Sequence, residues 1–223
     1  MPWRWACAST LPTMPHERDV AAFDNRSQRY EQGWLGRLHR DIVDTTLELA
    51  LALDQTPSRL LDIGCGSGYL LRQTAARLPD AIEIVGIDPA AGMIEVARAA
   101  TSDKRVRFER GVAEKLQFAD DNFDLVLATT SFDHWADQRA GLTEAARVLA
   151  PGGYFVLVDL LSQWLLPTTI TARRGHARTV RRAQALLREA GLQPIGRHNL
   201  YVVVRALTAR KMLDNTDETS PTP

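Results

Sequence analysis

Five short apolar runs alternate with amphipathic stretches through the middle of this 223-residue chain, and this rhythm constrains the fold more than any other feature. The runs are residues 59–63, 83–87, 106–108, 123–128 and 154–159. Helical periodicity occupies residues 69–78, 91–100 and 137–149 between them. Because parallel strands are joined by crossovers that usually contain a helix, the alternation predicts a doubly wound, mostly parallel sheet with helices on both faces.

The flanking segments complete this α/β architecture. Two amphipathic helices are expected first, over residues 17–30 and 35–53. Thr179 has the chemistry of an N-cap for a later helix that ends before Gly191. Two final apolar runs, residues 194–197 and 200–207, are separated by only two residues and predict an antiparallel hairpin at the sheet edge. The sheet is therefore expected to have seven strands, with an antiparallel edge strand.

Composition narrows the environment of the protein. The 27 Lys and Arg residues balance 27 Asp and Glu residues, so no overall field attracts nucleic acid or an acidic membrane. Cys7 and Cys65 lie in unrelated contexts, which is untypical of a disulfide framework, and we expect a reducing, cytoplasmic compartment. No apolar run approaches the roughly 20 residues that span a bilayer, and residues 1–8 lack a secretory signal, so no membrane insertion is expected.

Residues 60–69 read Leu-Leu-Asp-Ile-Gly-Cys-Gly-Ser-Gly-Tyr, a strand that enters a loop with glycine at every second position before a helix begins. Such a loop lets the backbone approach a ligand closely, and the helix N-terminus offers unpaired N–H groups to an anionic group. Asp88 ends the second strand, 20 residues after Gly68, where a carboxylate can accept hydrogen bonds from both ribose hydroxyls. These features predict a nucleotide-like ligand; the alternative is a loop that turns tightly for packing alone.

The glycine spacing separates two classes of ligand. A dinucleotide loop needs GxGxxG, but here the third glycine comes one position early, at Gly68, and Tyr69 occupies the place where glycine is required. Asp62 precedes the loop, where it would repel the pyrophosphate of NAD but can accept a hydrogen bond from the ammonium group of an amino acid. A zwitterionic nucleoside therefore fits better than a dinucleotide.

The run from Asp62 to Gly68 resembles the cofactor motif of the class I S-adenosylmethionine-dependent methyltransferases of the small-molecule type, and the resemblance extends from about residue 23 to residue 211. Further segments resemble the family's motifs in the expected order: residues 85–89 with Met93 for ribose and adenine, 108–114 for the adenine edge, 123–129 for the fourth strand and 147–153 for the turn before the fifth. The resemblance implies a Rossmann-like fold and S-adenosyl-L-methionine as the cofactor.

The resemblance also implies a set of cofactor-binding residues: Asp62, Gly64, Cys65, Gly66, Gly68, Asp88, Pro89, Met93, Val112, Ala113, Glu114 and Thr129, with Tyr30 closing over the cofactor. The chain departs from the family at Val112, where members often carry an Asp that accepts a hydrogen bond from the adenine amino group. Losing that bond costs about 1 kcal/mol. Backbone groups at Ala113 can still read the adenine edge, while Val112 packs on the adenine face.

The candidate catalytic residue is His134. A sulfonium methyl group is already activated, so the protein's main tasks are to hold a nucleophile in line and to remove its proton. Residues 129–135 follow the fourth strand, at the edge where such sheets bind ligands, and an imidazole exchanges protons near neutral pH. The alternative for His134 is a structural role in holding the loop. Asp133 replaces the first of two histidines in the related family pattern, and Trp135 is expected to pack rather than to face the sulfonium.

The acceptor is expected to be a small, hydrophobic or aromatic molecule, because the segments from which the family builds its substrate cover are apolar here: Phe23, Tyr30, Trp34, Leu35 and residues 164–166. Ordinary packing of these residues is the alternative. The basic run 173–182 can attract an anion or nucleic acid, although a solvated helix face is the preferred interpretation. No Asn-Pro-Pro-Tyr or Pro-Cys motif follows the fourth strand, so DNA is not an expected substrate, and no metal-ligand spacing occurs.

We therefore expect a methyltransferase that acts as a monomer or homodimer and transfers a methyl group by in-line displacement. A non-catalytic S-adenosylmethionine-binding protein and a nicotinamide-dependent oxidoreductase are the alternatives. A single domain is expected over residues 17–211. Its parts are N-terminal helices and lid (17–56), cofactor-binding core (57–161), substrate-cover insertion (162–178) and C-terminal helix with hairpin (179–211). Residues 1–16, with an ordinary start at Met14, are expected to be disordered or to precede the true start, and residues 212–223 to be disordered.

Overall fold

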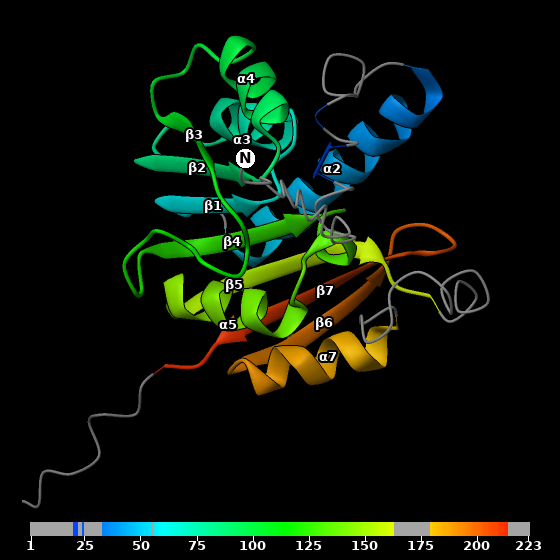
Figure 1. Cartoon of the computed structure of the whole chain (residues 1–223). Helices are drawn as coiled ribbons and strands as arrows, with labels where there is room; N and C mark the ends of the chain where they lie inside the picture. Colours follow the sequence, from blue (N-terminus) through cyan, green and yellow to red (C-terminus); the bar gives the residue numbers. More distant parts are fainter. Residues whose placement is uncertain (1–19, 22–23, 25–32, 55, 163–178, 214–223) are drawn as a thin grey trace, which may run out of the picture.

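The computed structural model describes residues 20–21, 24, 33–54, 56–162 and 179–213, which form one seven-stranded sheet flanked by helices (Figure 1). The strands are β1 (Arg59–Ile63), β2 (Glu83–Asp88), β3 (Val106–Arg110), β4 (Phe123–Thr129), β5 (Leu149–Leu160), β6 (Leu192–Asn199) and β7 (Val204–Lys211). Their order is β3-β2-β1-β4-β5-β7-β6. The first five pair in parallel, and β7 runs antiparallel to both of its neighbours. The predicted seven-stranded, mostly parallel sheet with an antiparallel hairpin at its edge is confirmed.

Two helical layers cover the sheet. One contains α2 (Gly33–Leu53), α3 (Tyr69–Arg77) and α4 (Ala91–Ala99), and the other contains α5 (Gln138–Val148) and α7 (Val180–Glu189) (Figure 1). Each layer has its own buried apolar cluster, with Leu47 and Leu71 in the first and Leu142 and Leu186 in the second. Because both faces are covered, the central strands are apolar on both sides rather than alternating.

The strand order reverses between β1 and β4, since the chain winds outward from β1 to β3 and then returns to place β4 on the other side of β1. In such sheets the loops at the carboxyl ends of the strands part at this point and leave a crevice. The loops after β1, β2 and β4 therefore meet at one edge of the sheet.

Local sequence explains the helix ends. The Asp137 side chain accepts hydrogen bonds from the backbone N–H groups of Arg139 and Ala140 at the start of α5. Thr179 accepts one from Arg182 at the start of α7, as predicted, and Gly191 follows this helix in a left-handed conformation (φ 84°).

The C-terminal hairpin differs from the prediction in the position of its turn. The turn lies at residues 200–203 rather than near Asn199, and Val202 within it is 84% exposed. The Arg205 guanidinium donates hydrogen bonds to the carbonyl oxygens of Tyr201 and Val202, which closes the turn without polar turn residues. A prediction from apolar character alone therefore started the second strand of the hairpin at residue 200, too early by comparison with Val204.

The remaining predictions either differ from the structure in a strand boundary or fall outside the described residues. Strand β5 begins at Leu149 rather than Tyr154, because Leu149 already pairs with Phe123 before an irregularity in the ladder. Of the helix expected over residues 17–30, only residues 20–21 and 24 are described. Residues 163–178 of the expected insertion (162–178) and the segments 1–19 and 214–223 lie outside the described residues. No helix in the described ranges combines the length and apolar character needed to cross a membrane.

Candidate functional site

A pocket opens at the carboxyl ends of the central strands, with about 900 Å³ of empty space including its solvent-filled mouth. Every described residue predicted to bind cofactor lines it, except Gly68, and so does His134. The lining residues from that set are Asp62, Gly64, Cys65, Gly66, Asp88, Pro89, Met93, Val112, Ala113, Glu114, Thr129 and His134. Tyr30 lies outside the described residues.

The glycines of the loop after β1 have different tasks. Gly66 lines the pocket in a left-handed conformation (φ 51°), and a Cβ built on it would meet no atom within 4 Å. Its bare backbone therefore offers a ligand a close approach. Gly68 is also left-handed (φ 77°), but a Cβ there would lie 2.6 Å from the Phe108 ring. Gly68 is thus required for packing against β3, and it does not line the pocket.

Asp88 connects the tip of β2 to the glycine loop. Its Oδ2 accepts a hydrogen bond from the Gly66 N–H (2.9 Å) and its Oδ1 accepts one from the Ala90 N–H (2.9 Å). Burial raises the pKa of Asp88, and these two backbone bonds act in the opposite direction. A carboxylate oxygen has two lone pairs, so each can still accept a hydroxyl from a ligand.

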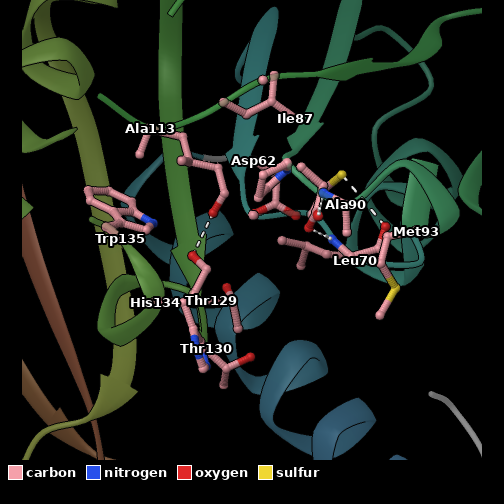
Figure 2. A pocket seen from close by; sticks show the side chains of 18 of the residues that line it. Asp62, Leu70, Ile87, Ala90, Met93, Ala113, Thr129, Thr130, His134 and Trp135 are labelled. Carbon is pink, nitrogen blue, oxygen red and sulfur yellow. Dashed lines mark hydrogen bonds between the residues drawn. The ribbon is translucent and has the colours of Figure 1, made fainter. Parts of the chain in front are cut away.

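Two polar atoms in the pocket wall have no hydrogen-bond partner among the described residues: Asp62 Oδ1 and Thr129 Oγ1. Asp62 is 2% exposed and Thr129 is 6% exposed, and both are labelled in Figure 2. Burial, and secondarily the nearby Asp88, raises the pKa of Asp62 to about 8. A buried polar group without a partner costs about 1–3 kcal/mol. These atoms fit a ligand that carries hydrogen-bond donors and, at Asp62, a positive charge.

Apolar residues build the part of the pocket beyond Asp88. Ala90 and Met93 at the start of α4 are each 1% exposed, and Ala113 on the connection between β3 and β4 lines the same pocket (Figure 2). That connection starts with a hydrogen bond from the Gly111 N–H to the Asp88 carbonyl oxygen (3.2 Å) and turns between Val112 and Lys115. These apolar residues line the same pocket as the Asp88 carboxylate, an environment that suits a nucleobase attached to a ribose.

The loop after β4 is firmly held. Thr130 adopts a left-handed conformation (φ 53°), which is uncommon for a β-branched residue, and its N–H donates to the Val158 carbonyl oxygen (2.7 Å). A short 3-10 helix, η2 (Phe132–His134), follows, and the Gln138 amide donates to the Phe132 carbonyl oxygen (3.1 Å). Figure 2 shows Thr130 and His134 together at the end of the pocket away from Met93. Such local strain is often maintained where a loop must present side chains to a ligand.

Behind this loop lies a buried acid on β5. Asp159 is 3% exposed, and its Oδ2 accepts a hydrogen bond from the Asp133 N–H (3.1 Å). Burial raises the pKa of Asp159, the Asp133 carboxyl raises it further, and His134 lowers it. Trp135 is 5% exposed and packs edge-on against Phe132 with ring centroids 5.2 Å apart, while also lining the pocket.

Cys65 is a free thiol in the pocket wall, 8% exposed. Burial raises its pKa well above the ordinary thiol value, and the nearby Asp88 and Asp62 add to the rise. The thiol is therefore neutral at physiological pH and contributes packing rather than a nucleophile.

Sequence reasoning did not single out the pocket residues of α2, His39 and Val43. They are four positions apart and so share one helix face, a signal that becomes informative only when the face is known to meet a pocket. Trp34, which was expected to cover the acceptor, is 65% exposed and does not line the pocket. Residues 164–166, expected in the same cover, lie outside the described residues, as does most of the basic run. Its described members Arg181 and Arg182 are exposed on α7.

The core of the chain is similar in sequence to known methyltransferases. Residues 61–157 match the family model described as a methyltransferase domain. The chain is 38% identical over 119 residues to the uncharacterized methyltransferase YcgJ of Bacillus subtilis, covering 52% of this chain and 46% of that protein. It is 39% identical over 112 residues to a demethylmenaquinone methyltransferase of Deinococcus radiodurans, covering 49% and 46%. The chain thus spans about half the length of the curated relatives that it matches.

Solved structures share the fold over most of the chain. A methyltransferase in complex with the Haloferax volcanii activator Trm112 superposes with a TM-score of 0.71 at 20% identity, covering 85% of this chain and 97% of the other. The Bacillus subtilis YcgJ structure gives 0.63 at 23% identity, covering 76% and 99%. The [4+2]-cyclase SpnF gives 0.66 at 20% identity, covering 82% and 83%. The same fold therefore occurs in proteins named for different reactions.

Proposed function

We propose that this chain is a class I S-adenosylmethionine-dependent methyltransferase that binds S-adenosylmethionine and methylates a small organic acceptor. The match of residues 61–157 to a methyltransferase-domain model and the relatives named as methyltransferases support this proposal. One observation carries the proposal: the unpartnered Asp62 Oδ1 lies in the wall of the pocket that also contains Asp88. A carboxyl group buried beside a second one is best stabilised by a cation, and the cofactor's amino-acid end carries an ammonium group.

The residues present fit each part of this cofactor. Asp62 and Thr129 would accept hydrogen bonds from the amino-acid end, and the bare backbone at Gly66 leaves room for it. Asp88 would accept the ribose hydroxyls. Ala90 and Met93 would enclose the adenine, whose edge meets the backbone at Ala113. When bound, the cofactor supplies a methyl group on a positively charged sulfur that an acceptor atom displaces in line.

The acceptor would enter at the end of the pocket formed by Thr130 and His134 on one side and by His39 and Val43 of α2 on the other. We assign to His134 the removal of the acceptor's proton as the new bond forms, because an imidazole can hold a proton near neutral pH. Closure of the pocket by α2 would keep water away from the reacting atoms.

The acceptor is proposed to be apolar or aromatic with one reactive hydroxyl, amine or acidic carbon. Val20, Val43 and Leu70 contribute apolar wall to the pocket. Relatives are named for acceptors of this kind: demethylmenaquinone in Deinococcus radiodurans and 27-O-demethylrifamycin SV in Amycolatopsis mediterranei. Because Cys65 is a free thiol, we further propose that the protein is cytoplasmic. We also propose that it is a monomer or a homodimer.

Parallel calorimetry with S-adenosylmethionine and NAD tests the cofactor, and an acceptor screen that reports S-adenosylhomocysteine release tests the reaction. We expect binding of the first compound only, followed by acceptor-dependent release. Binding of NAD in its place would overturn the proposal. Binding of S-adenosylmethionine without release for any acceptor would favour a non-catalytic role or a different reaction, as the fold of the SpnF cyclase illustrates.

A further inference from the structure

Helix α5 does more than cover the sheet, because two of its charged side chains hold the β3–β4 connection (residues 111–122). Glu144 Oε2 accepts a hydrogen bond from the Leu116 N–H (2.8 Å). The Arg147 guanidinium donates to the Leu116 carbonyl oxygen (3.0 Å) and to the Phe118 carbonyl oxygen (2.9 Å). Both peptide groups of Leu116 are thus held by the same helix.

The two side chains also hold each other. Arg147 Nε donates to Glu144 Oε1 (2.7 Å) and Arg147 Nη2 donates to Glu144 Oε2 (2.9 Å), which is a two-bond contact of fixed geometry. Arg147 Nη1 donates as well to Asp120 Oδ1 (2.6 Å). The guanidinium keeps the pKa of Glu144 below its usual range, and the two carboxylates raise the pKa of Arg147. The pair, which we call the Glu144–Arg147 clasp, therefore stays ionised over the physiological range.

The other end of the connection meets α5 closely. The Asp137 N–H donates to Glu114 Oε1 (3.0 Å), and a Cβ built on Gly141 would collide with the Trp135 ring and lie 3.2 Å from the Ala113 Cβ. Helix α5 consequently lies directly behind Ala113, whose other side faces the pocket. Any shift of the connection relative to α5 would move the backbone of Ala113.

In this chain, recognition of the adenine edge depends on the backbone at Ala113. Val112 has no polar side-chain atom, so it cannot accept a hydrogen bond from an adenine amino group. The base edge must then be recognised by peptide groups, and no hydrogen bond joins the Ala113 N–H to another of the described residues. Hydrogen bonds weaken steeply away from their preferred distance and angle, so recognition by backbone requires a backbone held in place.

We propose that Glu144 and Arg147 are positioning residues that fix the backbone at Ala113 for recognition of adenine and thereby set base selectivity. This inference rests on the proposed cofactor. It predicts that weakening the clasp reduces the preference for adenine over a base with the opposite hydrogen-bonding pattern at the same edge. Hypoxanthine is such a base, because it carries an N–H and a carbonyl where adenine has a bare nitrogen and an amino group.

The test compares S-adenosylhomocysteine with S-inosylhomocysteine by calorimetry on the full chain. The variants are Arg147→Lys, which keeps the charge but loses the two-bond contact, and Glu144→Gln, which keeps an oxygen for the Leu116 N–H. We expect the adenine ligand to bind about tenfold more weakly to Arg147→Lys and the inosine ligand to change little, so that selectivity falls. Arg139→Lys is the matched control, because Arg139 is on the same helix and pairs with Glu189, away from the connection.

Equal weakening of both ligands in a folded variant, or unchanged selectivity, would overturn the proposal. If Arg147→Lys does not fold, Glu144→Gln decides the question, and a selectivity equal to that of the wild type would then reject it. Failure of the cofactor assignment is distinguishable, because the wild-type protein would in that case bind neither nucleoside.

Discussion

Replacing Asp62 with Asn should make the ligand-free protein more stable at alkaline pH. In the wild-type fold the Asp62 carboxyl is buried, its Oδ1 has no partner among the described residues, and burial together with Asp88 raises its pKa from 3.8 to about 8. Ionisation is therefore disfavoured by the folded state and not by the unfolded chain. Asn keeps the shape of the side chain and removes the titration.

The sign and the size of the change in unfolding free energy follow from the linkage between protonation and folding. The folded state retains a proton at Asp62 that the unfolded chain has lost, so this group's contribution to stability falls as the pH rises from about 4 to about 8. At about 1.4 kcal/mol per pH unit, the pKa interval from 3.8 to about 8 corresponds to about 6 kcal/mol. Between about pH 5.5 and about pH 8 the Asp62→Asn variant should gain about 3 kcal/mol relative to wild type.

Urea unfolding of both proteins without ligand, at several pH values in that range, measures the difference. Asp80→Asn is the control, because Asp80 is exposed at the surface and should leave the two pH profiles parallel. Asp88 and Asp159 also have raised pKa values, so the wild-type slope alone is not diagnostic and the difference between variant and wild type is the quantity to use. Parallel profiles for wild type and Asp62→Asn would refute the reasoning.

Three further predictions concern the pocket and the glycine loop beside it. Binding of S-adenosylhomocysteine near pH 7 should release up to about one proton, measured by calorimetry in buffers of different ionisation enthalpy, and Asp62→Asn should release none. With an identified acceptor, His134→Gln should lower kcat about 100-fold, whereas His198→Gln, a change on the edge strand β6, should not. Gly68→Ala should cost at least about 2 kcal/mol of unfolding free energy, because its Cβ would meet Phe108, and more than Gly66→Ala, whose Cβ meets open space. Equal costs in urea unfolding would contradict that account.

The core of the fold was predictable because its signals are local. Alternating apolar runs indicate buried parallel strands wherever they occur, and Thr179 caps its helix through a bond three residues away. The hairpin turn failed because residues 200–203 are apolar, and the contact that closes them comes from Arg205 on the following strand. The contact is local, but an apolar turn closed by one long side chain lacks the Gly, Pro, Asn and Asp residues from which turns are usually recognised.

The residues of the candidate site also divide into those that the sequence indicates and those that it does not. The loop around Gly66 and the acid Asp88 are recognisable because a close backbone approach and a carboxylate at a strand end are chemical requirements with fixed spacing. His39 and the Glu144–Arg147 clasp were not recognisable, since their contacts join segments that are far apart in the sequence. Gly68 has a packing role that the loop pattern does not indicate, because a Cβ there would meet the Phe108 ring.

The electrostatics of the pocket also explain why the glycine spacing and Asp62 point to the same ligand. Asp62 and Asp88 lie in one buried wall, and each is disfavoured as an anion. A pyrophosphate placed there would add negative charge to a site that already resists it, whereas an ammonium group would relieve the repulsion and restore the missing hydrogen bond at Asp62. A cationic nucleoside thus favours the ionised form of Asp62 with release of its proton, whereas a dinucleotide would bring negative charge into a pocket that disfavours it.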